Sequence, residues 1–188
     1  MLESATLDTP RLRLRRLRAS DEPSLVTLDR DPEVMRYVGS PAGVRSPDET
    51  TARVRQRILE SDCGDHEPLG FWRIEGRDDE AFLGLGALLR MPESGPGPPD
   101  VEVAYRLARA AWGRGIATEA AGALVAHGLR TVGLPRLVAV TYPENRASQG
   151  VLDKLGFERR GLAEYKGVQA TFHVLTREAW SARDPRRD

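Results

Sequence analysis

The chain has 188 residues, of which 40% are hydrophobic and 30% are charged, a composition typical of a soluble globular protein. This length suits one domain with a substantial core, so we expect a single domain over residues 1–188 with its core at about 9–180. Lys+Arg and Asp+Glu each number 28, so the chain has no net charge to attract nucleic acid or an anionic membrane.

Cysteine content and hydropathy exclude further classes of protein. The single cysteine, Cys63, cannot form an internal disulfide or a cysteine metal cluster. Charged residues from Glu3 onward exclude a signal peptide, and the longest apolar run, residues 81–89, is far shorter than the roughly 20 residues of a membrane span. The sequence therefore predicts a cytoplasmic protein with no metal, no nucleic-acid partner and no membrane partner.

The first 60 residues predict one strand and two helices. Leucines alternate with arginines over residues 11–17, which is typical of a strand with a buried leucine face and a solvated arginine face. Ser20 is a candidate N-cap for a first helix. Ser46 and Glu49 form a capping box around Pro47, which predicts a second helix.

The middle of the chain predicts three strands. Segments 69–74 and 82–89 are apolar and flank turn-forming residues at 76–79, so we expect a β-hairpin. Four prolines and two glycines make residues 92–100 a loop within the domain. Apolar and polar residues then alternate over residues 101–107, which indicates another strand.

The C-terminal part alternates between helices and strands. We expect a helix with an apolar stripe over residues 116–127, a strand at 137–142, a helix at 147–155 and a strand at 170–175, with a frayed end after Trp180. This order of elements is an α+β pattern built on one mixed sheet. If the strands before and after the first of these helices are parallel neighbours, their connection is a right-handed crossover.

The segment with the strongest functional signal is Trp112-Gly113-Arg114-Gly115-Ile116-Ala117-Thr118, between a predicted strand and a predicted helix. Free N–H groups and the helix dipole make a helix N-terminus a site for phosphate, and glycines let the phosphate approach the backbone. Ordinary turn glycines are the alternative interpretation. The chain has no GxxxxGKS/T, which excludes a nucleotide triphosphatase loop. A dinucleotide fold is disfavoured because Thr118 stands where its third glycine would be.

Extended to Glu119-Ala120, this segment resembles the acetyl-CoA loop of the GNAT acetyltransferase superfamily, in particular its ribosomal-protein N-terminal acetyltransferase (RimJ/RimL-like) branch. The resemblance runs from about residue 9 to 180. Three other segments resemble the same branch in kind and order: Thr9-Pro10-Arg11-Leu12-Arg13-Leu14-Arg15, Asp31-Pro32-Glu33-Val34-Met35-Arg36-Tyr37, and Asn145-Arg146-Ala147-Ser148 followed by Leu152-Asp153-Lys154-Leu155-Gly156-Phe157.

The resemblance implies a three-layer α/β arrangement in which one mixed, twisted sheet of about six to seven strands is flanked by helices. It also implies acetyl-CoA as co-substrate, with its pantetheine arm between two diverging strands and its pyrophosphate on the glycine loop. Lys154 would lie near the adenosine, although a solvated helix charge is the alternative for it. The cofactor-binding residues that it implies are Val103, Ala104, Tyr105, Leu107, Arg109, Trp112, Gly113, Arg114, Gly115, Ile116, Ala117, Thr118, Asn145 and Lys154.

The catalytic residues are assigned on the same resemblance. An alkyl amine has a pKa near 10, so a base helps it to attack a thioester at neutral pH. Glu102, on the strand that would face the thioester, is the first candidate and Glu164 the second. Many family members carry a tyrosine as the acid where this chain has Leu152, which leaves Ser148 as candidate acid, or else as a local helix hydroxyl. His127 is expected to be a satisfied core histidine.

The predicted function is transfer of an acetyl group from acetyl-CoA to a primary amine, with a protein N-terminal amine as the first choice of acceptor. One alternative is the same fold acting on a small amine such as an antibiotic or polyamine. Another is a module that binds acyl-CoA without turnover, and a nicotinamide-dependent oxidoreductase is the weakest. A homodimer is left open.

Overall fold

The computed structural model describes residues 6–38, 46–61, 68–91, 100–165 and 167–183. Residues 92–99 of the predicted loop at 92–100, and Cys63, lie outside these ranges. In the described part no helix is long and apolar enough to cross a membrane.

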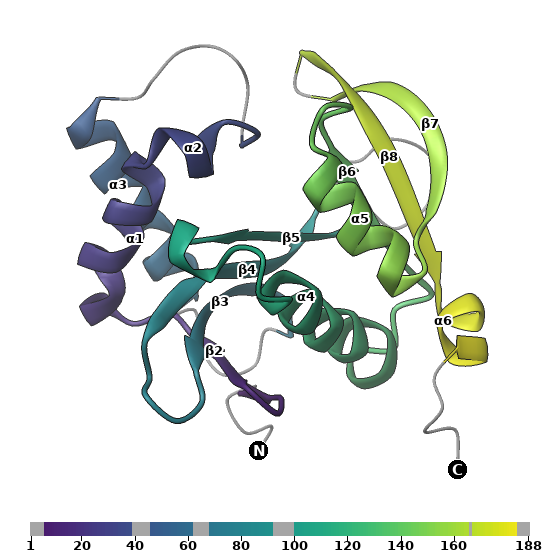
Figure 1. Ribbon diagram of the computed structural model, residues 1–188, viewed down its shortest axis with the longest axis horizontal. Helices are drawn as coiled ribbons and strands as arrows, with labels where there is room; N and C mark the ends of the chain where they lie inside the picture. The colour runs from purple at the N-terminus through teal and green to yellow at the C-terminus, as the bar shows by residue number, and fades with distance from the viewer. Residues whose placement is uncertain (1–5, 39–45, 62–67, 92–99, 166, 184–188) are drawn as a thin grey trace.

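A single mixed sheet forms the centre of the molecule, with strand order β1-β2-β3-β4-β5-β6-β8-β7 (Figure 1). Neighbouring strands are antiparallel except β5 and β6. The eight strands exceed the six to seven expected. Their bounds are β1 Leu7–Asp8, β2 Leu12–Arg16, β3 Gly70–Gly76, β4 Phe82–Arg90, β5 Val101–Leu107, β6 Arg136–Thr141, β7 Glu158–Tyr165 and β8 Val168–Thr176.

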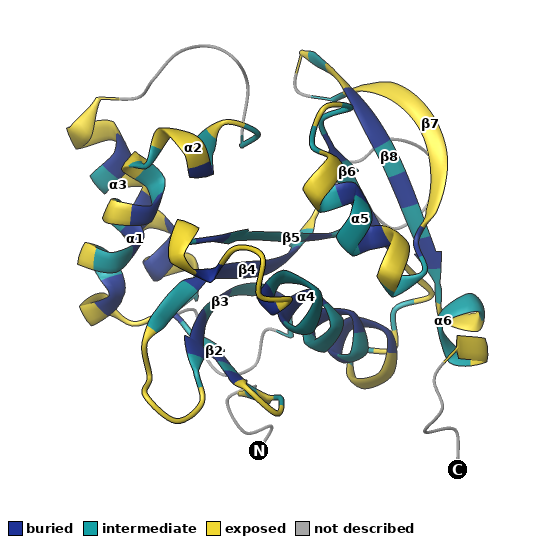
Figure 2. Ribbon diagram, in the orientation of Figure 1, coloured by how far each residue is buried: buried dark blue, intermediate teal, exposed yellow. Residues whose placement is uncertain are grey.

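Helices cover both faces of the sheet and make the predicted three layers. One face packs on α1 and α3 through a cluster that includes Leu25, Val54 and Leu85, and the other packs on α4 through a cluster that includes Val103 and Leu124 (Figure 2). The helices are α1 Glu22–Arg30, α2 Pro32–Met35, α3 Pro47–Ser61, α4 Ile116–Ala126, α5 Arg146–Leu155 and α6 Arg177–Arg183, with short turns η1 Ala19–Asp21 and η2 Arg109–Ala111 and a π-helical segment η3 His127–Thr131.

One predicted helix-end signal is confirmed and another is wrong. Glu49 N donates to Ser46 Oγ and Ser46 N donates to Glu49 Oε2, which confirms the capping box of α3. Gly115, with φ +75°, is the N-cap of α4, and Gly156, with φ +91°, is the C-cap of α5. Ser20 is not the N-cap of α1, which begins after a turn of 3₁₀ helix.

The start of α1 is displaced because Asp21 is drawn into a buried ion network. Its carboxylate accepts from both Nη1 and Nη2 of Arg15 at 2.9 Å and lies 3.2 Å from Arg73 Nη1. Glu75, also buried, accepts from Arg73 Nε at 2.7 Å. The face of β2 expected to be solvated is therefore covered at Arg15, while Leu12 and Leu14 occupy the buried face as predicted.

Two elements near the C-terminus were not predicted. Strand β7 is exposed at every position but its last and has an irregularity between Arg159 and Gly161 (Figure 2). It therefore carries no alternation of apolar and polar residues to reveal it. Helix α6 continues to Arg183, beyond the expected fraying point, and the ring of Trp180 lies 4.8 Å from the guanidinium of Arg130.

Strands β5 and β6 are parallel, but they pair at one position only, Glu102 opposite Val138. By contrast, β5 pairs with β4 along its whole length and β6 pairs with β8 along its own. The two central strands thus diverge from a single contact, so part of the facing edge of each is not paired to the other.

Buried charge also ties the helices to the sheet. Asp29 on α1 is 3% exposed and forms ion pairs with Arg57 on α3 and with Arg106 on β5, the latter at 2.9 Å. All three side chains are largely removed from water, so the attraction is screened less than on the surface. The carboxylate therefore links two helices to the strand that carries Glu102.

We expect Asp29→Asn to lower the free energy of unfolding by about 3 kcal/mol or more, because two buried guanidinium groups lose their counter-charge. Urea denaturation measures this loss. Glu22→Gln is the matched control, since it removes the exposed pair with Arg55 between the same two helices and should change stability little. Equal losses in the two variants would contradict a special contribution of Asp29.

Candidate functional site

The glycine loop between η2 and α4 has the backbone conformation that its glycines allow. Gly113 and Gly115 both have positive φ, +72° and +75°, a region that other residues enter only with strain. A Cβ on Gly113 would meet nothing within 4 Å, and one on Gly115 would meet only Arg11 Nη2, at 3.5 Å. The outer side of the loop is therefore open at the N-terminus of an 11-residue helix, the kind of place where an anion binds.

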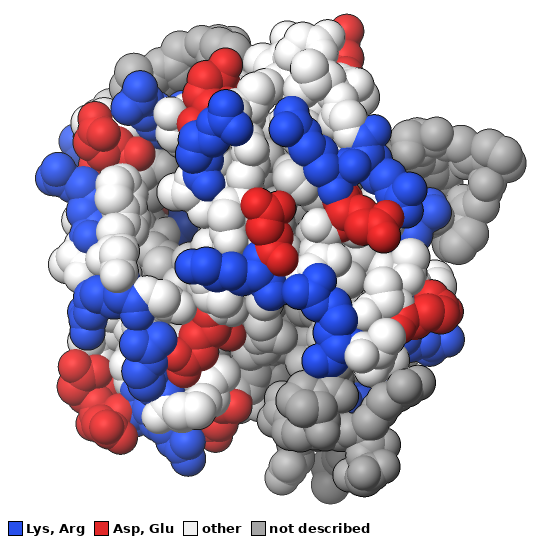
Figure 3. Space-filling view, turned by 45° about the vertical axis from the view of Figure 1, so that its right-hand side comes forward, with Lys and Arg blue, Asp and Glu red and all other residues white. Residues whose placement is uncertain are grey.

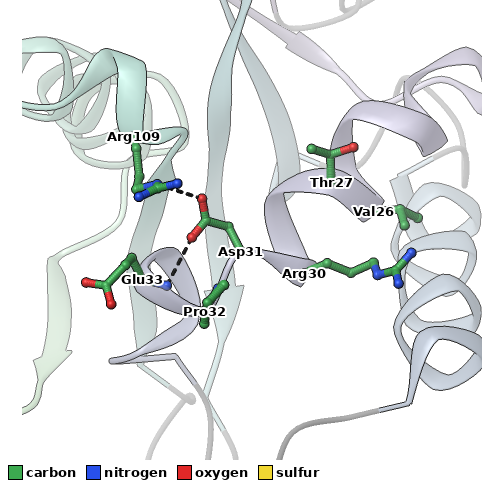
Figure 4. A pocket seen from close by; sticks show the side chains of 7 residues that line it. All are labelled: Val26, Thr27, Arg30, Asp31, Pro32, Glu33 and Arg109. Carbon is green, nitrogen blue, oxygen red and sulfur yellow. Dashed lines mark hydrogen bonds and ion pairs between the residues drawn. The ribbon is translucent and has the colours of Figure 1, made fainter.

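The flanks of the loop are fixed by two contacts. Trp112 is 46% exposed, yet its Nε1 donates to Leu107 O at 2.9 Å, which holds the ring beside the loop. Arg109 Nε lies 2.9 Å from Asp31 Oδ2 and joins η2 to the corner between α1 and α2. Figure 4 shows this ion pair at an open pocket of about 440 Å³. Its lining residues are Val26, Thr27, Arg30, Asp31, Pro32, Glu33 and Arg109.

Strand β5 presents chemically useful side chains on both of its faces. Successive side chains of a strand point to opposite faces. Val103 and Leu107 pack against α4, so Tyr105 shares their face, while Arg106 reaches Asp29 on α1 from the other face. Glu102 belongs to the face of Arg106, toward α1 and α3.

On the α1 side, Glu102 is held by a tyrosine from the end of β7. Tyr165 Oη donates to Glu102 Oε2 at 3.1 Å. Burial and the nearby charge of Glu102 raise the pKa of Tyr165 well above its ordinary value, so the phenol stays protonated and remains a donor at neutral pH. Its ring also packs edge-on against Phe172 with centroids 6.1 Å apart. The carboxylate of Glu102 therefore has a fixed hydrogen-bond donor.

On the α4 side, Tyr105 meets the first turn of α5. Tyr105 Oη lies 3.0 Å from Ser148 Oγ and donates to Ser148 O at 3.3 Å. Burial raises the pKa of Tyr105 to about 12, although its hydrogen bond to Ser148 opposes the rise. Asn145 caps the same turn, since its Oδ1 accepts from Ser148 N at 3.1 Å. The structure thus brings three predicted residues together.

Several predicted residues lie apart from these two groups. Leu152, at the usual tyrosine position, is fully buried in the core. Glu164 is exposed on β7 beside Tyr165 and lies opposite Gln169 of β8. Lys154 is exposed in the last turn of α5. His127 is buried with Nε2 2.8 Å from Pro68 O, which confirms a satisfied core histidine.

The remaining residues of the predicted cofactor site follow the loop and the strand that lead into it. Ile116 is buried at the start of α4, whereas Arg114 is exposed and Ala117 and Thr118 are half-buried. Ala104 is half-buried on β5. No group of three or more histidines, cysteines, aspartates or glutamates that could hold a metal ion occurs among the described residues.

Two aromatic contacts near the site were missed by the sequence analysis. Tyr165 lies in a strand without alternation, and nothing in its neighbourhood links it to Glu102, 63 residues away. Tyr37, just after α2, lies with its ring centroid 5.9 Å from that of Tyr142, just after β6. This second contact joins the two halves of the molecule that stand on either side of β5 in Figure 1.

Comparison with known proteins agrees with this arrangement. The family of the Acetyltransferase (GNAT) domain matches residues 11–158. An uncharacterized N-acetyltransferase, p20 of Bacillus licheniformis, is 31% identical over 157 residues, which cover 84% of each chain. A second relative, the uncharacterized N-acetyltransferase YoaA of Bacillus subtilis, is 26% identical over 158 residues, covering 83% of this chain and 84% of its own.

Solved structures share the fold over almost the whole chain. An acetyltransferase of Agrobacterium tumefaciens has a TM-score of 0.72 at 26% identity, covering 91% of this chain and 94% of its own. RimL, a ribosomal L7/L12 alpha-N-protein acetyltransferase in complex with coenzyme A, has a TM-score of 0.72 at 22% identity, covering 92% and 98%. Because the family match spans most of the described fold, from β2 through α5, the chain belongs to the GNAT family of N-acetyltransferases.

Proposed function

We propose that this enzyme transfers the acetyl group of acetyl-CoA to the N-terminal amine of a protein. The observation that carries the proposal is the arrangement of β5 where it leaves β6, with Glu102 on one face and the Tyr105–Ser148 pair on the other. A base for the attacking amine and a proton source for the departing thiolate thus lie on opposite faces of one strand. The choice of a protein N-terminus follows the likeness to RimL, a ribosomal L7/L12 alpha-N-protein acetyltransferase.

Acetyl-CoA supplies an activated thioester, and residues of this chain fit its parts. The open glycine loop from Gly113 to Ala117 suits the diphosphate, with Arg109 and Arg114 as nearby cations. The parts of β5 and β6 that are not paired to each other suit the amides of the pantetheine arm, which would add hydrogen bonds as a further strand does. Asn145 uses Oδ1 as a cap and would turn its amide nitrogen to the same arm. Lys154 would stay near the adenosine.

The reaction then runs across the strand. Glu102 takes a proton from the acceptor amine, and the amine nitrogen forms a bond to the thioester carbonyl carbon. As the C–S bond breaks, Ser148 gives a proton to the thiolate of CoA and is reprotonated by solvent, while Tyr105 holds the serine in place. Glu102 releases the amine proton to solvent. The thiol has a pKa of about 8.5, with cysteine as reference, so a weak acid is enough.

The acceptor is tested by release of free CoA thiol from acetyl-CoA in the presence of peptides with free N-termini and of small amines. Faster turnover with peptides than with any small amine at equal concentration supports the proposal. Turnover with an antibiotic or polyamine alone would move the acceptor to small molecules. No turnover with any amine, together with tight binding of acetyl-CoA, would mean a binding module instead of an enzyme.

The diphosphate site is tested at Gly115. We expect Gly115→Ala to weaken CoA binding about tenfold or more in calorimetry, because the new Cβ distorts a backbone held at φ +75°. Gly133→Ala is the matched control, since Gly133 has φ +76° but lies in the turn before β6. Both variants should lose similar stability. Unchanged CoA affinity in Gly115→Ala would contradict a diphosphate on this loop.

The general base is tested at Glu102. Glu102→Gln keeps the shape and should lower kcat/KM by about 10²-fold or more, most strongly at low pH where the neutral amine is scarce. Tyr165→Phe should cost less, because the carboxylate remains. Glu164→Gln, on β7 next to Tyr165, is the control and should leave the pH–rate profile unaltered. The reverse result, with Glu164→Gln inactive and Glu102→Gln normal, would transfer the role to Glu164.

The proton donor is tested at Ser148. We expect Ser148→Ala to lower kcat by roughly 10²-fold with an almost unchanged KM for acetyl-CoA, which is the effect of losing a positioned acid. Tyr105→Phe removes only the second hydroxyl and should lower kcat less. An increase in KM alone would identify Ser148 as a cofactor contact, and no effect on either constant would leave it a helix-turn hydroxyl.

A further inference from the structure

The segment that leads into β2 is bonded to the first turn of α4. Glu119 on α4 accepts from three donors of this segment: Thr9 Oγ1 at 2.6 Å, Arg11 N at 3.0 Å and Arg11 Nε at 2.6 Å. Burial alone would raise the pKa of Glu119, but these hydrogen bonds and the charge of Arg11 outweigh it and lower that pKa. Glu119 is therefore an ionised anchor to which the N-terminal segment is fastened.

The same segment is rigid in itself. Thr9 Oγ1 accepts from Leu12 N at 2.9 Å, and Thr9 N donates to Leu12 O at 2.9 Å. This turn holds Arg11 between Thr9 and Leu12, which are hydrogen-bonded to each other. The side chain of Arg11 is 52% exposed, so it is not needed to fill the core.

From this anchor Arg11 reaches into the glycine loop. Its Nη1 donates to Arg114 O at 3.0 Å, and its Nη2 lies 3.5 Å from the point that a Cβ of Gly115 would occupy. A peptide unit is planar and trans, so the N–H of Gly115 points opposite to the carbonyl oxygen of Arg114. By holding that oxygen on its own side, Arg11 directs the Gly115 N–H to the other side of the peptide.

Such a contact matters most in a loop with two glycines. Glycine has more conformational freedom than any other residue, so a free loop loses entropy when a ligand orders it. A loop that is already held in its bound orientation binds more tightly because that cost is reduced. Fixing the peptide between Arg114 and Gly115 would therefore raise affinity without any direct contact to the ligand.

We infer that Arg11, supported by Thr9 and Glu119, is a positioning residue for the diphosphate site of the enzyme. It orients the peptide between Arg114 and Gly115, so that the loop amides face the diphosphate of CoA. The inference rests on the proposed function, because it assumes that the loop binds that diphosphate. It joins two sequence motifs, residues 9–15 and 112–120, into one structural unit.

The experiment measures binding of CoA and of dephospho-CoA, which lacks the 3′-phosphate but keeps the diphosphate, by calorimetry on the full chain. We expect Arg11→Gln to weaken both ligands by the same factor, about tenfold for a loss of about 1.4 kcal/mol. Arg11→Lys keeps the charge but lacks the separate Nε and Nη1 donors that reach Glu119 and Arg114, so it should also weaken both. Arg13→Gln is the matched control. Arg13 lies on β2, and among the described residues its ion pair is with Asp8, at 3.1 Å. This variant should therefore bind both ligands normally.

A second readout separates positioning from a general effect on the fold. With the amine that the acceptor screen identifies, kcat/KM for acetyl-pantetheine, which lacks the diphosphate, should stay unchanged in Arg11→Gln. A lower melting temperature of Arg11→Gln with unchanged CoA affinity would overturn the inference. Weaker binding of CoA with unchanged binding of dephospho-CoA would also overturn it, because Arg11 would then contact the 3′-phosphate. If the wild-type protein binds neither ligand, the proposed function itself is overturned. If the wild-type protein binds both ligands and Arg11→Gln binds them with the same affinity, only the inference is overturned.

Discussion

The single pairing between Glu102 and Val138 is the constraint on which the site depends. A β-strand that is buried in a sheet normally has partners for the backbone groups on both of its edges. Strand β5 keeps its partner on the β4 side along its whole length, and on the other side it meets β6 once and then diverges. The divergence of β5 from β6 in the centre of the sheet thus follows from the strand pairing, and it leaves part of the facing edge of each strand not paired to the other.

Alternation along β5 turns this opening into two chemical environments. The face toward α1 carries Glu102 with its donor Tyr165, and the face toward α4 carries Tyr105 with Ser148. Helices α1–α3 cover the first face and α4 and α5 lie on the second (Figure 1). A reaction in which one group loses a proton and another gains one therefore has a separate place for each. Both chemical environments follow from the alternation of side chains along this one strand.

The sequence predicted the elements whose signals are local. The capping box at Ser46, the hairpin over β3 and β4 and the glycine loop before α4 each depend on residues a few positions apart. What it could not predict depends on partners far along the chain. Strand β7 has no alternation because almost all of it is exposed, and Ser20 loses its expected role because Asp21 is bonded to Arg15 and Arg73. The sequence alone shows Leu152 at the position where many family members have the tyrosine acid. The hydrogen bond between Ser148 and Tyr105 could be seen only in the structure.

Charge shows the same dependence on distant partners. The composition has equal numbers of the two signs, and Figure 3 shows both signs interspersed over one face of the molecule. Several arginines nevertheless form specific ion pairs that link one element to another. Asp29 holds Arg106 and thereby one face of β5, and Glu119 holds Arg11 beside the glycine loop. A buried ion pair contributes little more stability than apolar side chains of the same size would, although removing one partner is costly. Each pair also links two elements: Asp29 connects α1 and α3 to β5, and Glu119 connects α4 to the segment before β2.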